Sequence, residues 1–226
     1  ESVMHRQDEN NLLNILKNNI NKNSKILDIG CGIGNNLEIL KHHGYSNIYG
    51  VDISLDMVEE TREKGFTALS VDDFFNSNMD GFDVLLFSHV LEHIGYPDIV
   101  NVLESYFSKA KDGAHIVIIM PLLYDAFFND IDHIKPYYPN GLMALFSNKT
   151  ISKQYKSNYL LNIVDIYFRK EELVPYNLKS RYIRSFRNRL FLEVFTIVMK
   201  ILKRLSFNII SKTTGYIAIF RIAKSK

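Results

Sequence analysis

Side chains that could do chemistry gather in two short stretches of this chain. The first starts at Asp28 and continues with glycines at alternate positions, Gly30, Gly32 and Gly34. Glycine adopts positive φ without a Cβ penalty and lets another group approach the backbone closely. A helix that follows such a turn points free N–H groups at whatever lies against it. The stretch therefore predicts a ligand-binding turn between a strand and a helix.

The second stretch combines imidazole and carboxylate side chains. Positions i, i+3 and i+4 of a helix share a face, so His89, Glu92 and His93 are expected to converge. His133, farther along the chain, is a fourth candidate ligand. Imidazole with carboxylate suits zinc, iron, cobalt, nickel or manganese better than a purely oxygen-ligated magnesium. The alternative without a metal uses His93 or His133 as a general base, because imidazole titrates near neutrality.

The elements that must position these groups alternate between apolar strands and amphipathic helices. This alternation predicts an α/β fold with a doubly wound sheet. We expect helices over 12–20, 37–42 and 57–64, and strands over 25–29, 47–52, 66–71, 82–87, 115–120, 161–168 and 215–222. Ligands of such sheets bind outside the carboxyl ends of the strands. Asp28, Asp52, Asp72 and Ser88 would lie at that edge.

The spacing of the glycines distinguishes between families of nucleotide-binding loop. A dinucleotide loop, G-x-G-x-x-G, needs its third glycine where Asn35 stands, and a phosphate loop needs Lys followed by Ser or Thr where Asn35 and Asn36 stand. Both fit poorly, which disfavours a nicotinamide oxidoreductase. The remaining pattern, acid-x-Gly-x-Gly-x-Gly, resembles motif I of the class I S-adenosylmethionine (SAM)-dependent methyltransferases.

This resemblance implies a Rossmann-like, seven-stranded fold with SAM as cofactor and S-adenosylhomocysteine as its product. Asp52 lies about 20 positions after Gly30, where nucleotide-binding βαβ units place an acid that accepts from ribose hydroxyls. Like the family's acid at this place, Asp72 would accept from the adenine amino group, or else cap a helix. The cofactor-binding residues implied are Asp28, Gly30, Cys31, Gly32, Gly34, Asn35, Asp52, Ile53, Asp72, Asp73 and Ser88.

A second resemblance concerns the stretch from Ser88, S-H-V-L-E-H-I. It resembles the E-V-L-E-H pattern of quinone-pathway and other small-molecule methyltransferases, with His89 in place of the first Glu. Together with the distant His133 it is similar to the E-x-x-E-H site of small-RNA 3′-terminal 2′-O-methyltransferases. That similarity implies a divalent transition metal held by His89, Glu92, His93 and His133, while the change of one Glu to His leaves the identity of the metal open.

A basic segment separates the last two predicted strands. Between residues 179 and 212 there are nine Lys or Arg and one acid, Glu193, a balance of +8 in a chain whose total is +2. Apolar residues recur there near helical spacing, so we predict a basic amphipathic helix or helix pair. Such a segment suits a membrane interface, a homodimer contact or the sheet's own face. We assign 1–168 with 214–226 to a methyltransferase domain and 169–213 to a helical insertion within it.

The acceptor is the least specified part of the prediction. The insertion, and the D-x-x-H-x-x-P-Y stretch from Asp130, resemble those of methyltransferases of surface-glycan assembly, whose substrates are large, anionic or lipid-linked. We therefore predict an O-methyltransferase acting on a hydroxyl of a saccharide or lipid-linked glycan. The alternatives are an RNA 2′-O-methyltransferase, although no RNA-binding module is recognisable, a quinone-type small-molecule O-methyltransferase, and a non-catalytic SAM-binding assembly protein.

The length and composition of the chain are those of an ordinary globular protein with one domain. A chain of 226 residues with 46% hydrophobic and 23% charged residues buries a proper core. Its single cysteine, Cys31, has no partner for an internal disulfide, which suits a reducing compartment. No signal-peptide pattern and no run of eighteen apolar residues is present in this sequence. The expectation is a cytoplasmic protein, with peripheral attachment to the inner membrane surface as an option.

Overall fold

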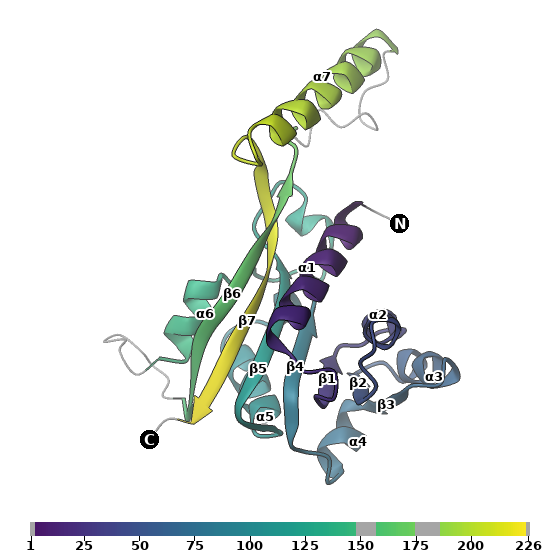
Figure 1. The fold of residues 1–226 in the computed structure, drawn as a ribbon, viewed down its shortest axis with the longest axis vertical. Helices are drawn as coiled ribbons and strands as arrows, with labels where there is room; N and C mark the ends of the chain where they lie inside the picture. Colours follow the sequence, from purple (N-terminus) through teal and green to yellow (C-terminus); the bar gives the residue numbers. More distant parts are fainter. Residues whose placement is uncertain (1–2, 148–156, 175–185, 225–226) are drawn as a thin grey trace.

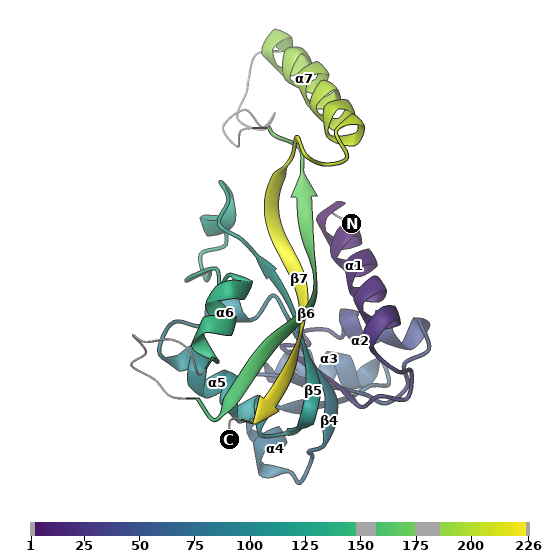
Figure 2. The ribbon, with the colours of Figure 1, turned by 60° about the vertical axis from the view of Figure 1, so that its left-hand side comes forward.

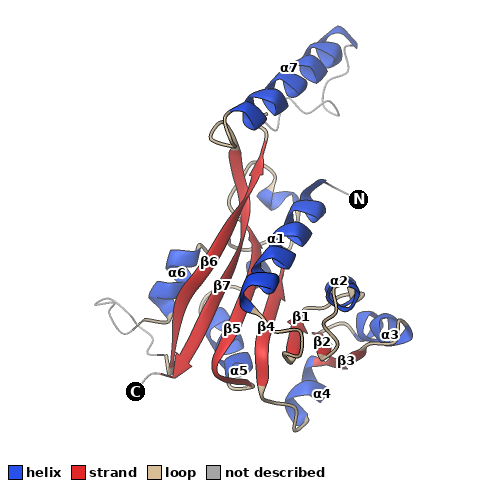
Figure 3. Ribbon diagram, viewed as in Figure 1, coloured by secondary structure: helices blue, strands red, loops and turns tan. Residues whose placement is uncertain are grey.

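The computed structural model describes residues 3–147, 157–174 and 186–224, which form one seven-stranded sheet with helices on both faces (Figure 3). The strands are β1 (Ile26–Ile29), β2 (Ile48–Asp52), β3 (Thr67–Ser70), β4 (Phe82–Ser88), β5 (Ala110–Pro121), β6 (Tyr159–Glu171) and β7 (Lys212–Lys224). The helices are α1 (Val3–Asn19), α2 (Asn35–His42), α3 (Leu55–Glu63), α4 (Val71–Asn76), α5 (Asp98–Phe107), α6 (Pro139–Leu145) and α7 (Phe186–Leu205). Two short 3₁₀ turns, η1 (Leu91–His93) and η2 (Phe127–Asn129), complete the described elements.

The strand order confirms the predicted doubly wound sheet. It runs β3-β2-β1-β4-β5-β7-β6; β1 to β5 pair in parallel, and β7 is antiparallel to both of its neighbours. The carboxyl ends of the five parallel strands therefore share one edge, which is where ligands of such sheets bind.

Alternating side chains divide the core between the two faces of the sheet. Along β4, Val84 and Leu86 pack with Leu12 of α1, whereas Leu85 and Phe87 belong to the cluster on the opposite face. The opposite cluster includes residues of α4, α5 and α6. Because all four of these β4 side chains are almost inaccessible to solvent, β4 is a central strand buried on both sides, as its uniformly apolar sequence predicts.

Several boundaries differ from the sequence expectation. The third strand ends at Ser70, since the Ser70 hydroxyl accepts from the Asp73 N–H and caps α4. The predicted insertion over 169–213 is too long at both ends, because β6 and β7 stay paired to the register Glu171↔Lys212. The intervening segment is therefore 172–211, and its described helix is α7. Its predicted part over 175–185 lies outside the described residues.

The β6–β7 hairpin reaches past the carboxyl edge of the sheet. Pro121, the last residue of β5, pairs with Gly215, and the hairpin continues beyond this point. Helix α7 lies at the far end of the hairpin, clear of the sheet and on the same side as the start of α1 (Figures 1 and 2). Within the described ranges, no helix combines the length and the apolarity that crossing a membrane requires.

Candidate functional site

The glycine turn after β1 has the conformation that its sequence predicts. Gly30, Gly32 and Gly34 all have positive φ, at 69°, 51° and 83°. A Cβ on Gly30 would lie 2.3 Å from Cγ2 of Val90, so this glycine permits close packing. A Cβ on Gly32 would meet no atom of the described chain within 4 Å. Gly32 is thus the position where the turn is open to a ligand.

Side chains from β2 and α3 hold this turn in place. Oδ2 of Asp52 accepts from the Gly32 N–H at 2.8 Å, and Oδ1 accepts from the Ser54 N–H at 2.9 Å. The Thr61 hydroxyl donates to the Gly32 carbonyl at 2.8 Å. Each carboxylate oxygen of Asp52 keeps further acceptor capacity. The structure therefore places Asp52 beside the open glycine, where the sequence predicts a ribose-binding acid.

Asp28 lies beneath the turn and is fully buried. Burial raises the pKa of its carboxyl group to about 7, the charge of Asp52 adds to this, and a hydrogen bond from Asn36 opposes it. That bond reaches Oδ1 at 3.2 Å, while Oδ2 has no hydrogen-bond partner in the described part of the chain. A buried carboxylate oxygen without a partner is costly, so it marks a place where a donor from a ligand would be stabilised.

Cys31 packs inward from the same turn. Burial first, and then the charges of Asp28 and Asp52, raise the pKa of its thiol to about 12. A Cβ on Gly50 would lie 2.7 Å from its sulfur, so the thiol fills the space against β2. Because only the thiolate is nucleophilic, Cys31 shapes the turn and is not a reactive group.

The remaining predicted cofactor residues lie along the same edge of the sheet. The register pairs Asp52 with Ser70, so the loops after β2 and β3 are neighbours. Ile53 is 87% exposed, and Asp72 and Asp73 are exposed in the first turn of α4. The helix-capping alternative for Asp72 is wrong, since Ser70 is the cap. Asn35 opens α2 and Ser88 closes β4.

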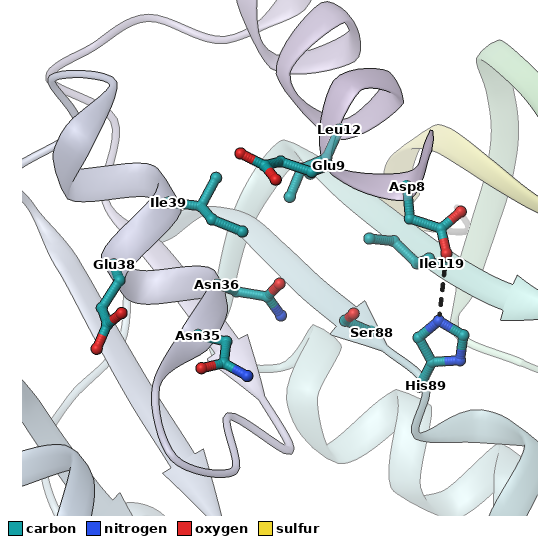
Figure 4. A pocket seen from close by; sticks show the side chains of 10 residues that line it. All are labelled: Asp8, Glu9, Leu12, Asn35, Asn36, Glu38, Ile39, Ser88, His89 and Ile119. Atoms are coloured by element: carbon teal, nitrogen blue, oxygen red, sulfur yellow. Dashed lines mark ion pairs between the residues drawn. The ribbon is translucent and has the colours of Figure 1, made fainter. Parts of the chain in front are cut away.

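A cavity of about 400 Å³ lies between α1, α2 and the end of β4 (Figure 4). Asn35, Asn36 and Ser88 line it from the glycine-turn side. Asp8 of α1 and His89 face each other across its other end, with 3.6 Å between Asp8 Oδ2 and His89 Nε2. The cavity therefore connects the turn with the histidine-rich segment that follows β4.

Glu92, His93 and His133 converge next to this segment. One ligand-type atom from each lies within 4.8 Å of the others. Nδ1 of His133 is 2.7 Å from the Phe127 carbonyl, and Nδ1 of His93 is 3.2 Å from the Asp132 carbonyl. Each carbonyl can only accept, so in a neutral ring the proton sits on Nδ1 and Nε2 carries a lone pair. Metal-ligating histidines typically donate their other ring N–H to a carbonyl or carboxylate in this way.

The reason for this convergence differs from the one predicted. The segment after β4 is not an α-helix, because His89 has a positive φ of 56° and only Leu91–His93 form a 3₁₀ turn. His133 arrives from the loop after β5, whose backbone N–H groups at Ile134 and Lys135 donate to the Glu92 carbonyl. Three of the four predicted ligands are therefore brought together by a loop-to-loop contact and not by a helical face.

His89, the fourth predicted ligand, lies outside that group of three. Its Nδ1 is 3.1 Å from Oε1 of Glu92, and its Nε2 faces Asp8. Burial alone would lower its pKa, but the two carboxylates outweigh burial and raise the pKa of His89 to about 9. A protonated imidazole has no lone pair for a metal. The structure favours His89 as a cation between Asp8 and Glu92.

Two residues of this site were not predicted from the sequence, Asp8 and Arg169. Both are buried, and they form an ion pair between α1 and β6. The Arg169 guanidinium also donates to the side chain and carbonyl of Thr214 on β7. A signal for Asp8 exists in the sequence, because Asp8, Leu12 and Ile15 share one face of α1 at helical spacing. An acid on an otherwise apolar face has to meet a partner.

A second cavity, of about 650 Å³, adjoins the first at Asp8 and His89. It reaches the cluster through His93 and His133. Most of the residues that line it carry a polar or titratable group; they are Asp8, His89, His93, Tyr124, Ala126, Asn129, Asp130, Ile131, His133 and Arg169. One continuous region therefore leads from the glycine turn, past Ser88, to a polar chamber beside Glu92.

Comparisons with known proteins agree with this geometry. Residues 4–159 match the model of a family described as a methyltransferase domain. The chain is 26% identical over 129 residues to a carboxy-S-adenosyl-L-methionine synthase of Campylobacter fetus, covering 54% of this chain and 55% of that protein. It is 31% identical over 104 residues to a trans-aconitate 2-methyltransferase of Rhodopseudomonas palustris, covering 43% and 38%. The chain thus spans about half the length, or less, of these curated relatives.

A solved structure matches over nearly the whole chain. It is that of a SAM-dependent methyltransferase from Archaeoglobus fulgidus, with 25% sequence identity and a TM-score of 0.61. The match covers 96% of this chain and 93% of that one. The similarity therefore includes the antiparallel β6–β7 end of the sheet as well as the glycine turn.

Proposed function

Because the chain belongs to the SAM-dependent class I methyltransferases, we propose that it transfers the methyl group of SAM to a hydroxyl of a saccharide held beside Glu92, His93 and His133. The observation that carries this proposal is the cluster itself. Nδ1 of each histidine lies within hydrogen-bond distance of a backbone carbonyl, and one ligand atom from each histidine lies near the buried Glu92. The cluster follows β4, the strand next to β1 and its glycine turn.

We infer one orientation of the cofactor on the turn. The amino-acid part would lie over Gly32, where a Cβ would meet open space, and its ammonium group would donate to the unpartnered Oδ2 of Asp28. The ribose hydroxyls would donate to Asp52. The adenine would then lie over Ile53, toward Asp72 and Asp73. Asn35 and Ser88 would border the methionine end of this site, where the first cavity begins.

The chemistry asks little of the protein beyond alignment and a base. The sulfonium of SAM is already a good leaving group, so the acceptor oxygen forms a bond to the methyl carbon as the carbon–sulfur bond breaks and S-adenosylhomocysteine leaves. Positioning the two reactants lowers the barrier by removing their relative freedom. A sugar hydroxyl must also lose its proton, which is the step that the cluster would assist.

Glu92, His93 and His133 fit a divalent transition ion by ligand type. Two neutral imidazoles and a carboxylate are a three-ligand set of the kind that leaves one position open for a substrate oxygen. Oε2 of Glu92 is buried without a hydrogen-bond partner among the described residues, which suits a ligand atom. When bound, the ion would lower the pKa of the acceptor hydroxyl.

A base without a metal is the second candidate for this step. Nε2 of His133 is 4.0 Å from Oε1 of Glu92 and 3.7 Å from Oδ2 of Asp130. These carboxylates would stabilise the imidazolium that forms when His133 takes the hydroxyl proton. His93 is the alternative base, because it lies beside His133 and could reach the same hydroxyl; the two ring centroids are 4.9 Å apart.

The lining of the second cavity supports a polyhydroxylated acceptor. Polar side chains such as Asn129 and Asp130 line this cavity and are of the kind that bind sugar hydroxyls, and Tyr124 adds an aromatic ring to the lining. An RNA backbone would meet the carboxylates of Asp8 and Asp130, and the charge of Arg169 is already paired with Asp8.

The proposal is tested by following labelled methyl groups from SAM into a panel of saccharides, short RNAs and quinols. We expect label on a saccharide oxygen, and a rate that His133→Ala lowers by about 100-fold or more, the usual size of an acid–base or metal contribution. His43→Ala is the matched control, because His43 is an exposed histidine whose Nδ1 likewise contacts a carbonyl, at the end of α2.

Chelation separates the two versions of the mechanism. The metal version predicts that a chelator abolishes transfer and that metal add-back restores it, while the general-base version predicts full activity in chelator. Label that appears only in RNA or quinol would overturn the saccharide assignment. An absence of transfer to any of the three classes, with SAM bound, would favour the non-catalytic reading.

A further inference from the structure

Helix α7 exposes an apolar sector that the described residues leave uncovered. Its large apolar side chains include Phe191, Val194, Ile197, Val198, Ile201 and Leu205, which are between 45% and 72% exposed. At 3.6 residues per turn these six positions occupy about 120° of the helix circumference. Apolar side chains in this number and continuity are unusual on a surface that only contacts water.

A different side of α7 is less exposed to solvent. Leu192 is buried, and Phe195 and Met199 are half-buried. On the same side, Nζ of Lys203 donates to the Lys170 carbonyl at the end of β6 and lies 3.8 Å from Oε1 of Glu172. The helix is therefore attached to the hairpin through this side, and among the described residues the exposed apolar sector takes no part in the attachment.

The third side of α7 is basic. Arg189, Lys200 and Arg204 are exposed there, next to Glu193, the one acid between residues 179 and 212. The apolar sector is thus bordered by cations. This combination of a hydrophobic sector and a basic flank is the pattern of helices that lie in the interface of a membrane.

The position of α7 relates it to the candidate site. The hairpin that carries it continues past the Pro121↔Gly215 register, at the carboxyl edge of the sheet (Figures 1 and 2). The turn after α7 exposes Phe207 to 90% and Ile209 to 85%, and the loop after β5, beside the second cavity, exposes Phe128 to 63% and Ile131 to 93%. The exposed apolar side chains are therefore concentrated at the end of the molecule that holds the site.

We propose that α7 and the turn after it dock the chain on an anionic lipid surface. The apolar sector enters the headgroup–acyl boundary, and the basic flank binds the anionic headgroups. Charge complementarity favours this occupant over a second copy of the chain, since two copies would bring two basic flanks together. Docking would set the polar chamber close to the lipid surface, within reach of an acceptor attached to a lipid. The inference does not rest on the proposed methyl transfer.

Flotation with vesicles tests this docking directly. Wild type is expected to float with vesicles made of equal parts phosphatidylglycerol and phosphatidylcholine, and at least about tenfold less with phosphatidylcholine alone. The double variant Val194→Glu with Ile201→Glu should reduce flotation about tenfold or more, because it places charge in the centre of the apolar sector. Asn188→Glu is the matched control, since it adds a carboxylate at an exposed position of α7 outside that sector. SAM binding by each variant verifies that the domain is folded.

Two results would overturn the docking proposal. The first is wild type that stays unbound with the phosphatidylglycerol vesicles at low salt. The second is a solution mass of two chains that Val194→Glu with Ile201→Glu reduces to one, since this would assign the apolar sector to a second copy. Methyl transfer and SAM binding could survive either result, so failure here is distinguishable from failure of the proposed function.

Discussion

At the scale of single residues, comparing two glycines separates two effects of an added side chain. One effect is strain in the backbone, and the other is a clash with a bound ligand. Gly32 and Gly44 both have positive φ, and a Cβ on either would meet no described atom within 4 Å. Alanine at either position should cost folding about 1 kcal/mol, the usual penalty of a left-handed residue. Only Gly32→Ala should also weaken SAM binding, by about tenfold or more, because its methyl group occupies the cofactor's space.

Calorimetric titration with SAM, together with denaturant unfolding, measures the two effects independently. Equal SAM affinity in Gly32→Ala and Gly44→Ala would show that the open side of the turn does not hold the cofactor.

The residues of this turn could be identified directly from the sequence, since the spacing of Asp28, the glycines and Asp52 is local to one strand–helix–strand unit. Asp8 and Arg169 lie more than a hundred residues apart, and no local pattern pairs them.

At the scale of elements, α1 is joined to the sheet by a network that contains one titrating group. His89 links Glu92 to Asp8 of α1, and its pKa of about 9 lies above the ordinary histidine value of 6.5. A raised pKa means that the stabilisation is complete below pH 6.5 and is lost as pH rises through 9. We expect α1 to lose up to about 2 kcal/mol of protection over this range, after allowance for the partial exposure of His89.

Hydrogen exchange of the α1 amides, corrected for the intrinsic pH dependence of exchange, measures this loss. His89→Gln keeps a hydrogen-bonding side chain but does not titrate, so its α1 protection should be the same on both sides of the range. If wild type and His89→Gln respond alike to pH, the network does not hold α1 through a charged His89.

The sequence predicts the centres of most strands well because these centres are apolar runs. The ends of the strands depend on partners elsewhere in the chain. β6 and β7 continue beyond their apolar centres because they pair with each other. The sequence of either strand alone does not indicate this pairing. The i, i+3, i+4 spacing of His89, Glu92 and His93 predicts a helix after β4. The structure has a short 3₁₀ turn there instead, and Glu92 and His93 still lie close together. The loop after β5 donates two hydrogen bonds to the Glu92 carbonyl, and this long-range contact assembles the cluster.

At the scale of the whole molecule, the cofactor turn, the polar chamber and α7 share one end. The parallel strands end there, and the antiparallel hairpin continues beyond them (Figure 1). The sequence indicated a basic amphipathic segment but left open whether it covers the sheet. The structure answers that part of the question, because the apolar sector of α7 is exposed and its attachment uses another side.

The central claim is the proposal that one edge of the sheet holds SAM at the glycine turn and a divalent ion at Glu92, His93 and His133. Native mass spectrometry of the intact protein tests both parts at once, after incubation with SAM and with zinc, manganese or cobalt. Wild type should carry one nucleoside and one ion, Gly32→Ala should lose the nucleoside and keep the ion, and His133→Ala should lose the ion and keep the nucleoside. A wild type that fails to bind SAM or fails to bind any of the three ions, or variants that lose both together, would contradict the claim.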